Sequence, residues 1–149
     1  MKLLITGGCG FIGSNFIKVA VKKNNFNILN VDKLTYSSNK ASLKDINYLP
    51  NYSFKKLDIC NKKALSSTIA KYQPDSIIHF AAETHVDRSI ETPSKFIETN
   101  IIGTQNLLDV SLKLYKSMSN KKKKKFRFLH ISTDEVYGDL KNKRKLFNE

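Results

Sequence analysis

The sequence lacks any run of about 18 apolar residues, the length that a membrane-spanning helix needs. Its first apolar stretch, residues 2–6, is short and is followed at once by glycines, so it does not fit the apolar core of a signal peptide. The only two cysteines, Cys9 and Cys60, form no C-x-x-C pair, and the three histidines do not cluster at metal-ligand spacing. We therefore expect a cytoplasmic protein with no membrane partner and no metal.

Acidic residues are scarce, with 13 Asp and Glu against 26 Lys and Arg, which gives a net charge of +13. Such an excess ordinarily indicates nucleic acid or another polyanion as a partner. Here lysines occur in every part of the chain, and the densest run, residues 121–125, falls where a helix-to-strand loop is expected. We interpret this run as a solvated loop and expect no nucleic-acid partner. Anion docking at the run is the alternative.

Glycines are few, only six, and four of them lie between residues 7 and 13. Gly8, Gly10 and Gly13 fit the spacing G-x-G-x-x-G between a strand-like run and an amphipathic helix. In this motif one glycine permits a tight turn, one lets the backbone approach a pyrophosphate, and one lets the helix pack closely on the strand. The phosphates would bind at the helix N-terminus. A plain turn is the alternative, but the strand and helix on either side favour a dinucleotide site.

Asp32 ends the next predicted strand, residues 27–31, and stands 19 positions after Gly13. A carboxylate at this position accepts hydrogen bonds from the ribose hydroxyls of adenosine and repels a 2′-phosphate. The sequence therefore predicts NAD as the cofactor. A capping or turn aspartate is the alternative.

The rest of the chain alternates predicted strands, at residues 52–57, 76–82 and 126–132, with predicted helices. A helix capped by Asn61 precedes the strand at 76–82, and a longer helix follows from Thr92 and Pro93. This alternation predicts an α/β fold, a doubly wound parallel sheet of the Rossmann type with strand order 3-2-1-4-5. The ligand crevice then lies at the carboxyl ends of the first and fourth strands, beside the polar loop at residues 81–89.

The long helix is expected to bury one apolar face. Asn100 falls within that face, so we interpret it as a structural bridge to the neighbouring loop. The predicted buried residues are Phe96, Ile97, Ile101, Leu107, Leu108, Leu112 and Tyr115.

Two adjacent carboxylates, Asp134 and Glu135, follow the last predicted strand. Beside a nicotinamide, such a pair can combine an acid and a base, provided that crowding and partial burial distinguish the two groups. Two exposed loop acids would give the same pattern, and spacing alone does not separate these interpretations.

Six stretches of the sequence resemble the extended short-chain dehydrogenase/reductases, and among them the dTDP-glucose 4,6-dehydratase family. Sugar-nucleotide epimerases of this superfamily usually carry small hydroxyl residues where this chain has Thr133, Asp134 and Glu135, and the Asp-Glu pair is what a dehydratase needs. The stretches are TGGCGFIGSN (6–15), VDKLTYSSN (31–39), LDIC (57–60), HFAAETHVDRSI (79–90), FIETNIIGT (96–104) and HISTDEVYGDL (130–140).

The resemblance implies a lyase of nucleotide-sugar metabolism and deoxysugar biosynthesis, which dehydrates dTDP-glucose to the 4-keto-6-deoxy sugar nucleotide. It implies that Glu135 removes the C5 proton and that Asp134 protonates the departing C6 hydroxyl. Substrate-binding residues would be Thr84, His85, Arg88 and Thr133. Cofactor-binding residues would be Gly7, Gly10, Phe11, Ile12, Gly13, Asp32, Lys33, Leu34, Thr35, Asp58, Ile59, Phe80, Ala81, Ala82, Thr84 and Thr99.

The sequence departs from the family in one respect, because no Tyr-x-x-x-Lys catalytic pair follows the Asp-Glu loop. Tyr137 and Lys141 have the spacing, but Tyr137 belongs to the family's VYG turn. We therefore expect the N-terminal portion of such an enzyme, truncated before the later strands and the substrate domain and inactive alone. It would consist of an NAD-binding domain at residues 1–140 and a lysine-rich tail at 141–149, and the full-length enzyme would be a homodimer. An NAD-binding remnant without catalysis, another 4,6-dehydratase or an epimerase are the alternatives.

Overall fold

The computed structural model describes residues 1–23, 26–138 and 146. Its five parallel strands form one sheet in the order β3-β2-β1-β4-β5, as the sequence predicts. The strands are β1 (Lys2–Thr6), β2 (Asn27–Asp32), β3 (Tyr52–Lys56), β4 (Ser76–His79) and β5 (Arg127–His130). The fourth and fifth strands are shorter than predicted, because the chain leaves the sheet after His79 and His130 to form loops at its carboxyl edge.

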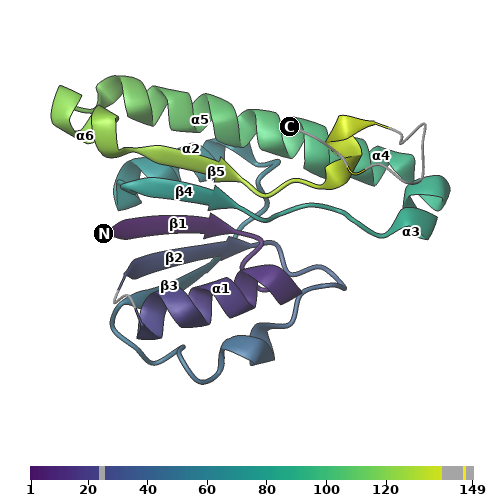
Figure 1. The fold of residues 1–149 in the computed structure, drawn as a ribbon, viewed down its shortest axis with the longest axis horizontal. Coiled ribbons are helices and arrows are strands. Elements are labelled where there is room, and N and C mark those ends of the chain that lie inside the picture. Colours follow the sequence, from purple (N-terminus) through teal and green to yellow (C-terminus); the bar gives the residue numbers. More distant parts are fainter. Residues whose placement is uncertain (24–25, 139–145, 147–149) are drawn as a thin grey trace.

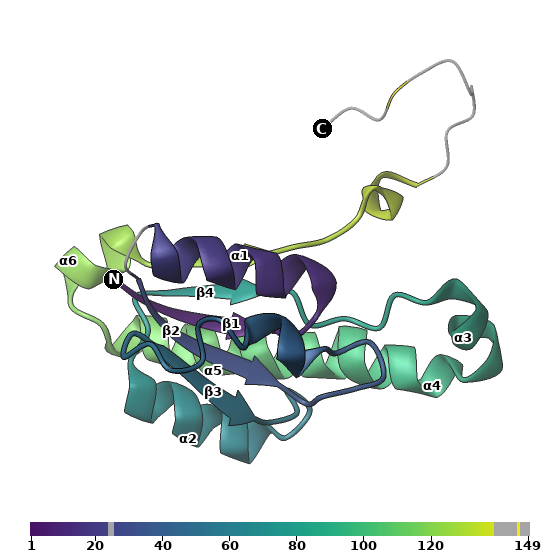
Figure 2. The same cartoon turned by 90° about the horizontal axis from the view of Figure 1, so that it is seen from below.

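Helices cover both faces of the sheet (Figures 1 and 2). On one face lies α1 (Phe11–Lys22), and on the other lie α2 (Lys62–Tyr72) and α5 (Thr104–Ser117). Two apolar clusters fill the two interfaces, one around Ile5 and Ile17 and the other around Leu4 and Leu107. This is the doubly wound arrangement that the strand and helix alternation predicts.

Several short helices connect the elements of these layers. The 3-10 helices are η1 (Lys40–Leu43) and η3 (Asp134–Tyr137), and a π-helix, η2 (Ile97–Gly103), runs directly into α5. The short α-helices are α3 (Val86–Glu91), α4 (Pro93–Phe96) and α6 (Asn120–Lys125). Within the described ranges, no helix is both long and apolar enough to span a bilayer.

Two predicted loops are wrong. The lysine run forms α6 rather than a loop, since lysine is a good helix former and the backbone N–H of Phe126 closes the last turn on the carbonyl of Lys122. The second half of the polar loop at 81–89 belongs to α3.

The predicted buried face of the long helix is also wrong, apart from Leu107. The residues that face the sheet and α2 are mostly small or polar, and Gly103 lies so close to Ile59 that a Cβ on Gly103 would meet its side chain at 2.7 Å. The apolar residues Ile101, Leu108 and Leu112 are 59%, 44% and 51% exposed instead. The apolar periodicity therefore marks a surface stripe, while close packing selects small residues for the core. The buried residues of η2 and α5 are Thr99, Gly103, Asn106, Leu107, Val110, Ser111 and Leu114.

Candidate functional site: a dinucleotide cleft

The glycine turn between β1 and α1 places its tightest point at Gly7. Gly7 has φ +71°, and a Cβ there would lie 2.5 Å from the backbone nitrogen of Ala81. Gly13 is equally constrained, because its Cβ would meet the carbonyl oxygen of Gly7 at 2.5 Å. The left-handed position is thus Gly7, one residue before the G-x-G-x-x-G spacing begins. Gly10 has ordinary dihedral angles, and its Cβ would meet only the carbonyl oxygen of Gly7, at 3.3 Å.

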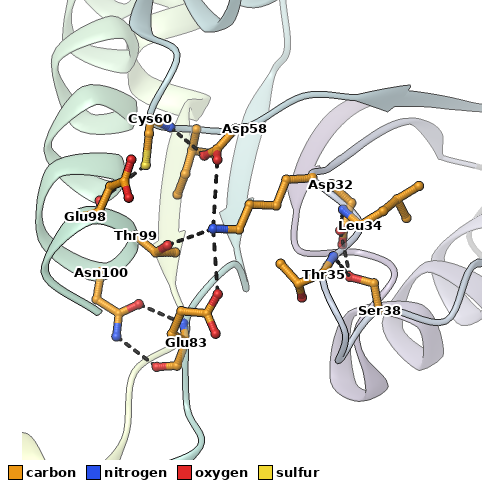
Figure 3. A network of polar contacts seen from close by, with 12 residues as sticks. Asp32, Leu34, Thr35, Ser38, Asp58, Cys60, Glu83, Glu98, Thr99 and Asn100 are labelled. Carbon is orange, nitrogen blue, oxygen red and sulfur yellow. Dashed lines mark hydrogen bonds and ion pairs between the residues drawn. The ribbon is translucent and has the colours of Figure 1, made fainter. Parts of the chain in front are cut away.

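Asp32 closes this turn from the end of β2. One carboxylate oxygen accepts a hydrogen bond from the backbone N–H of Cys9 (2.9 Å). The other accepts from the backbone N–H of Leu34 (2.8 Å) and from the hydroxyl of Ser38 (2.9 Å), as Figure 3 shows for the second oxygen. The side chain is therefore held in place by protein donors at the mouth of the cleft. The turn's thiol, Cys9, is buried, and burial raises its pKa to about 11, so it is neutral and unreactive.

A cavity of about 80 Å³ lies between this turn and the carboxyl ends of the neighbouring strands. Ten of the sixteen residues predicted to bind the cofactor line it: Gly7, Gly10, Asp32, Lys33, Thr35, Ile59, Phe80, Ala81, Ala82 and Thr99. Leu34 and Asp58 line an adjoining cavity of about 670 Å³. Phe11 and Ile12 are 85% and 61% exposed at the start of α1, and Gly13 packs on Gly7 beneath them.

Four residues that line the first cavity were missed by the sequence analysis, namely Val31, Ser37, Ser38 and Leu57. The two serines lie in a polar loop whose composition gives no sign of an inward-facing hydroxyl. Glu83 also lines this cavity and falls within the stretch from Phe80 to Thr84, which the family resemblance places at NAD.

The ammonium of Lys33, just after β2, contacts residues from three other segments. It donates a hydrogen bond to the hydroxyl of Thr99 (2.9 Å) and forms ion pairs with Asp58 (3.8 Å) and Glu83 (3.7 Å). Figure 3 labels these three partners and marks the contacts with dashed lines. One lysine thus ties together the ends of β2, β3 and β4 and the π-helix η2.

A third cavity, of about 400 Å³, lies at the carboxyl ends of β4 and β5. Thr84, Thr133 and Glu135 line it, and the hydroxyl of Thr133 donates a hydrogen bond to the carboxylate of Glu135 (3.3 Å). The predicted substrate and catalytic residues are therefore only partly brought together, since His85, Arg88 and Asp134 do not line this cavity. Asp134 and Glu135 are both exposed, so the partial burial expected of this pair is not present in the described part of the chain.

Arg88, predicted to bind the substrate, lies against an aromatic ring of the loop that follows β2. Its guanidinium carbon lies 3.5 Å from the centroid of the Tyr36 ring. The cation therefore stacks on the loop that follows β2.

Between the sheet and α5, the buried ring of His79 supports the carboxyl end of β4. Its two nitrogens contact the hydroxyls of Thr6 (2.6 Å) and Thr104 (3.0 Å). Burial, followed by the nearby His130, lowers the pKa of His79 to about 4. The ring is therefore neutral near pH 7 and acts as a hydrogen-bonded core residue. Among the described residues, no three His, Cys, Asp or Glu side chains are grouped as metal ligands would be.

Comparison with known proteins identifies the family to which the chain belongs. Residues 4–149 match the family described as GDP-mannose 4,6 dehydratase. The chain belongs to this family. It is 51% identical over 140 residues to the dTDP-glucose 4,6-dehydratase of Salmonella typhimurium, which covers 94% of this chain and 39% of that relative.

Solved structures agree with this assignment. The crystal structure of dTDP-glucose 4,6-dehydratase from Bacillus anthracis in complex with NAD is 37% identical, with a TM-score of 0.81, over 100% of this chain and 42% of that one. The UDP-Glc/GlcNAc 4-epimerase from Campylobacter jejuni is 25% identical, with a TM-score of 0.80, over 99% of this chain and 43% of that one. The chain thus spans about two fifths of the length of these relatives.

Proposed function

We propose that this chain forms the NAD-binding, N-terminal part of a dTDP-glucose 4,6-dehydratase. The observation that carries the proposal is the continuity of the two cavities: the glycine turn and Asp32 face one, Thr133 and Glu135 face the next, and residues 81–83 line both. A dinucleotide that enters at the glycine turn would extend along residues 81–83 toward the carboxylate loop. The similarity to dTDP-glucose 4,6-dehydratases supports the choice of nucleotide sugar.

Under this proposal the described residues fit NAD. The carboxylate of Asp32 would accept the ribose hydroxyls and repel a 2′-phosphate, while the backbone at Gly10, Phe11 and Ile12 would receive the pyrophosphate. Bound NAD would supply the hydride acceptor and later the hydride donor of the reaction. Lys33, Leu34, Asp58, Ile59 and Thr99 would enclose the adenosine half, and Phe80, Ala81 and Ala82 would lie along the cofactor.

The carboxylate loop would perform the proton transfers of the dehydration. Glu135 would remove the C5 proton and Asp134 would protonate the departing C6 hydroxyl, with Thr84 and Thr133 holding the sugar. Glu135 lies in the cavity with these threonines and supports this role. In this structure Arg88 lies against Tyr36, so its contribution would be at the cofactor.

We further propose that the protein functions as a homodimer in the cytoplasm, and that residues 1–140 are its cofactor domain. The apolar stripe of η2 and α5 supports a second copy as partner, because its side chains repeat at helical spacing and remain exposed. They are Ile97 (54%), Ile101 (59%), Leu108 (44%), Leu112 (51%) and Tyr115 (38%). The unpaired thiols of Cys9 and Cys60 fit a reducing compartment. The predicted tail at 141–149 lies outside the described residues, apart from Leu146.

The decisive experiment is an assay of the protein that carries this sequence with dTDP-glucose, following formation of the 4-keto sugar by its absorbance in alkali. We expect turnover that Glu135→Gln lowers by at least 100-fold while NAD binding is retained. NAD binding without turnover would favour the cofactor-binding remnant. Epimerisation of the sugar at C4 in place of dehydration would favour the epimerase.

A further inference from the structure

Two charged residues of the cleft, Lys33 and Glu83, each line more than one of its cavities. Lys33 lines the first and second cavities, and Glu83 lines the first and the third, the one beside the carboxylate loop. Both also line a side cavity of about 260 Å³ under Tyr36 and Arg88. The first cavity, at about 80 Å³, is far smaller than the roughly 300–1,000 Å³ of pockets that hold organic ligands. The first cavity is therefore narrow for a dinucleotide, and the Lys33–Glu83 pair lies where it meets its neighbours.

This pair joins two segments that face each other across the cleft. Residues 33–36 follow β2, and residues 83–88 follow β4. The ammonium of Lys33 lies 3.7 Å from the carboxylate of Glu83, whose side chain is only 10% exposed. Farther out, the guanidinium of Arg88 stacks on the ring of Tyr36 at 3.5 Å. The same two segments are thus linked by two contacts, the Lys33–Glu83 ion pair and the Arg88–Tyr36 cation–π contact.

Glu83 links the two contacts. One of its carboxylate oxygens faces Lys33, and the other receives the Tyr36 hydroxyl at 3.5 Å, the outer limit of a hydrogen bond. Its backbone is fixed from behind by Asn100, which bonds both its N–H (2.8 Å) and its carbonyl (2.9 Å), as seen in Figure 3. A carboxylate held in this way can release Lys33 and recapture it without moving the β4 loop.

We propose that Glu83, Tyr36 and Arg88 form a clasp with Lys33 that opens to admit NAD and closes behind it. The inference rests on the proposed function. It fits a reaction in which the hydride returns to the product, because the oxidised cofactor is restored in every cycle and has no need to leave. In this role Glu83, Tyr36 and Arg88 are positioning residues of the cofactor site.

The test is stopped-flow binding and release of NADH by the protein that carries this sequence, read by the fluorescence of the bound nucleotide. Glu83→Gln keeps the shape of the side chain and removes its charge. We expect it to raise the rate of NADH release roughly threefold to tenfold without slowing association, in line with the strength of one partly buried ion pair. Arg88→Ala should raise the release rate roughly twofold to fivefold.

Matched controls separate the clasp from general destabilisation. Glu91→Gln, on the exposed end of α3, and Tyr48→Phe, at a 75% exposed ring, should leave both rates unchanged. Tyr36→Phe keeps the stack on Arg88 and should have a smaller effect than Arg88→Ala. The melting temperature of each nucleotide-free variant is measured in parallel, and if Glu83→Gln melts earlier than the parent, Arg88→Ala decides the question.

Release rates of Glu83→Gln and Arg88→Ala equal to the parent's would overturn the clasp and leave the proposed function standing. Slower association of NADH with these variants, at an unchanged release rate, would also overturn the clasp. A weakened clasp should open more easily and so should not slow the entry of the nucleotide. Absence of NADH binding by the parent protein would overturn both proposals together.

Discussion

The side chain of Asn100 forms hydrogen bonds with both the N–H and the carbonyl of Glu83. Its amide oxygen accepts from the Glu83 N–H at 2.8 Å, and its amide nitrogen donates to the Glu83 carbonyl at 2.9 Å. The two residues belong to different elements, the π-helix η2 and the loop after β4. This pairing fixes the segment that precedes Thr84, and it confirms the structural bridge predicted for Asn100.

Asn100→Ala should therefore destabilise the protein by about 1–3 kcal/mol, because two backbone groups of a partly buried loop lose their partner. Urea unfolding monitored by circular dichroism measures the loss. Asn120→Ala, at the exposed start of α6, is the control and should change stability by less than about 0.5 kcal/mol. Equal effects of the two substitutions would contradict the bridge.

Two glycines of the first turn should separate folding from cofactor binding. A Cβ on Gly13 would meet backbone at 2.5 Å, so Gly13→Ala should cost about 1–3 kcal/mol of stability. A Cβ on Gly10 meets only one atom, at 3.3 Å, and Gly10 lines the first cavity, so Gly10→Ala should fold normally and bind NAD at least tenfold more weakly. Thermal unfolding and calorimetric titration compare the two. Normal NAD affinity in Gly10→Ala would argue against a pyrophosphate at this turn.

The buried His79 predicts how stability depends on pH. The folded state lowers the pKa of His79 to about 4 from a normal 6.5, so the unfolded chain binds the proton more readily. The stability that neutral His79 contributes is fully present above about pH 6.5 and is lost as the pH falls toward 4. At pH 5 the loss of stability is about 2 kcal/mol. Urea unfolding at pH 7.5 and pH 5 measures this loss. Variant His79→Gln should lose less stability on acidification than the parent, whereas His85→Gln, at an exposed site, should behave as the parent does.

The exposed stripe on α5 predicts an oligomeric state. If two copies meet there, the double substitution Leu108→Glu and Leu112→Glu should convert a dimer to a monomer without loss of helix content. Sedimentation equilibrium gives the mass. Val19→Glu, at a side chain that is 47% exposed on α1, places the same charge on the other layer and should leave the dimer intact. A monomeric parent protein would contradict the assignment of the stripe.

Local signals were sufficient for most of the fold. The glycine turn, the apolar strands and the cap at Asn61, whose side chain accepts from the Ala64 N–H at 3.0 Å, are each defined by a few neighbouring residues. The strand order followed from the alternation of strands and helices, because the handedness of the crossovers leaves few topologies. The cofactor-lining residues followed from the strand ends together with the family resemblance.

Features that depend on packing between distant segments could not be predicted. The buried side of α5 is chosen by how closely Gly103 approaches Ile59, and the apolar pattern alone pointed to the wrong face. Arg88 stacks on Tyr36, which is far away in sequence. Ser38 reaches Asp32 only because the loop after β2 folds back on itself.

The measurement that tests the account most directly is calorimetric titration of the protein with NAD and with NADP. We expect NAD to bind at least tenfold more tightly than NADP, and Asp32→Ala to remove most of that preference, because the carboxylate both accepts the ribose hydroxyls and repels the 2′-phosphate. Failure to bind NAD, or equal affinity for the two nucleotides in the parent protein, would contradict the assignment of this cleft.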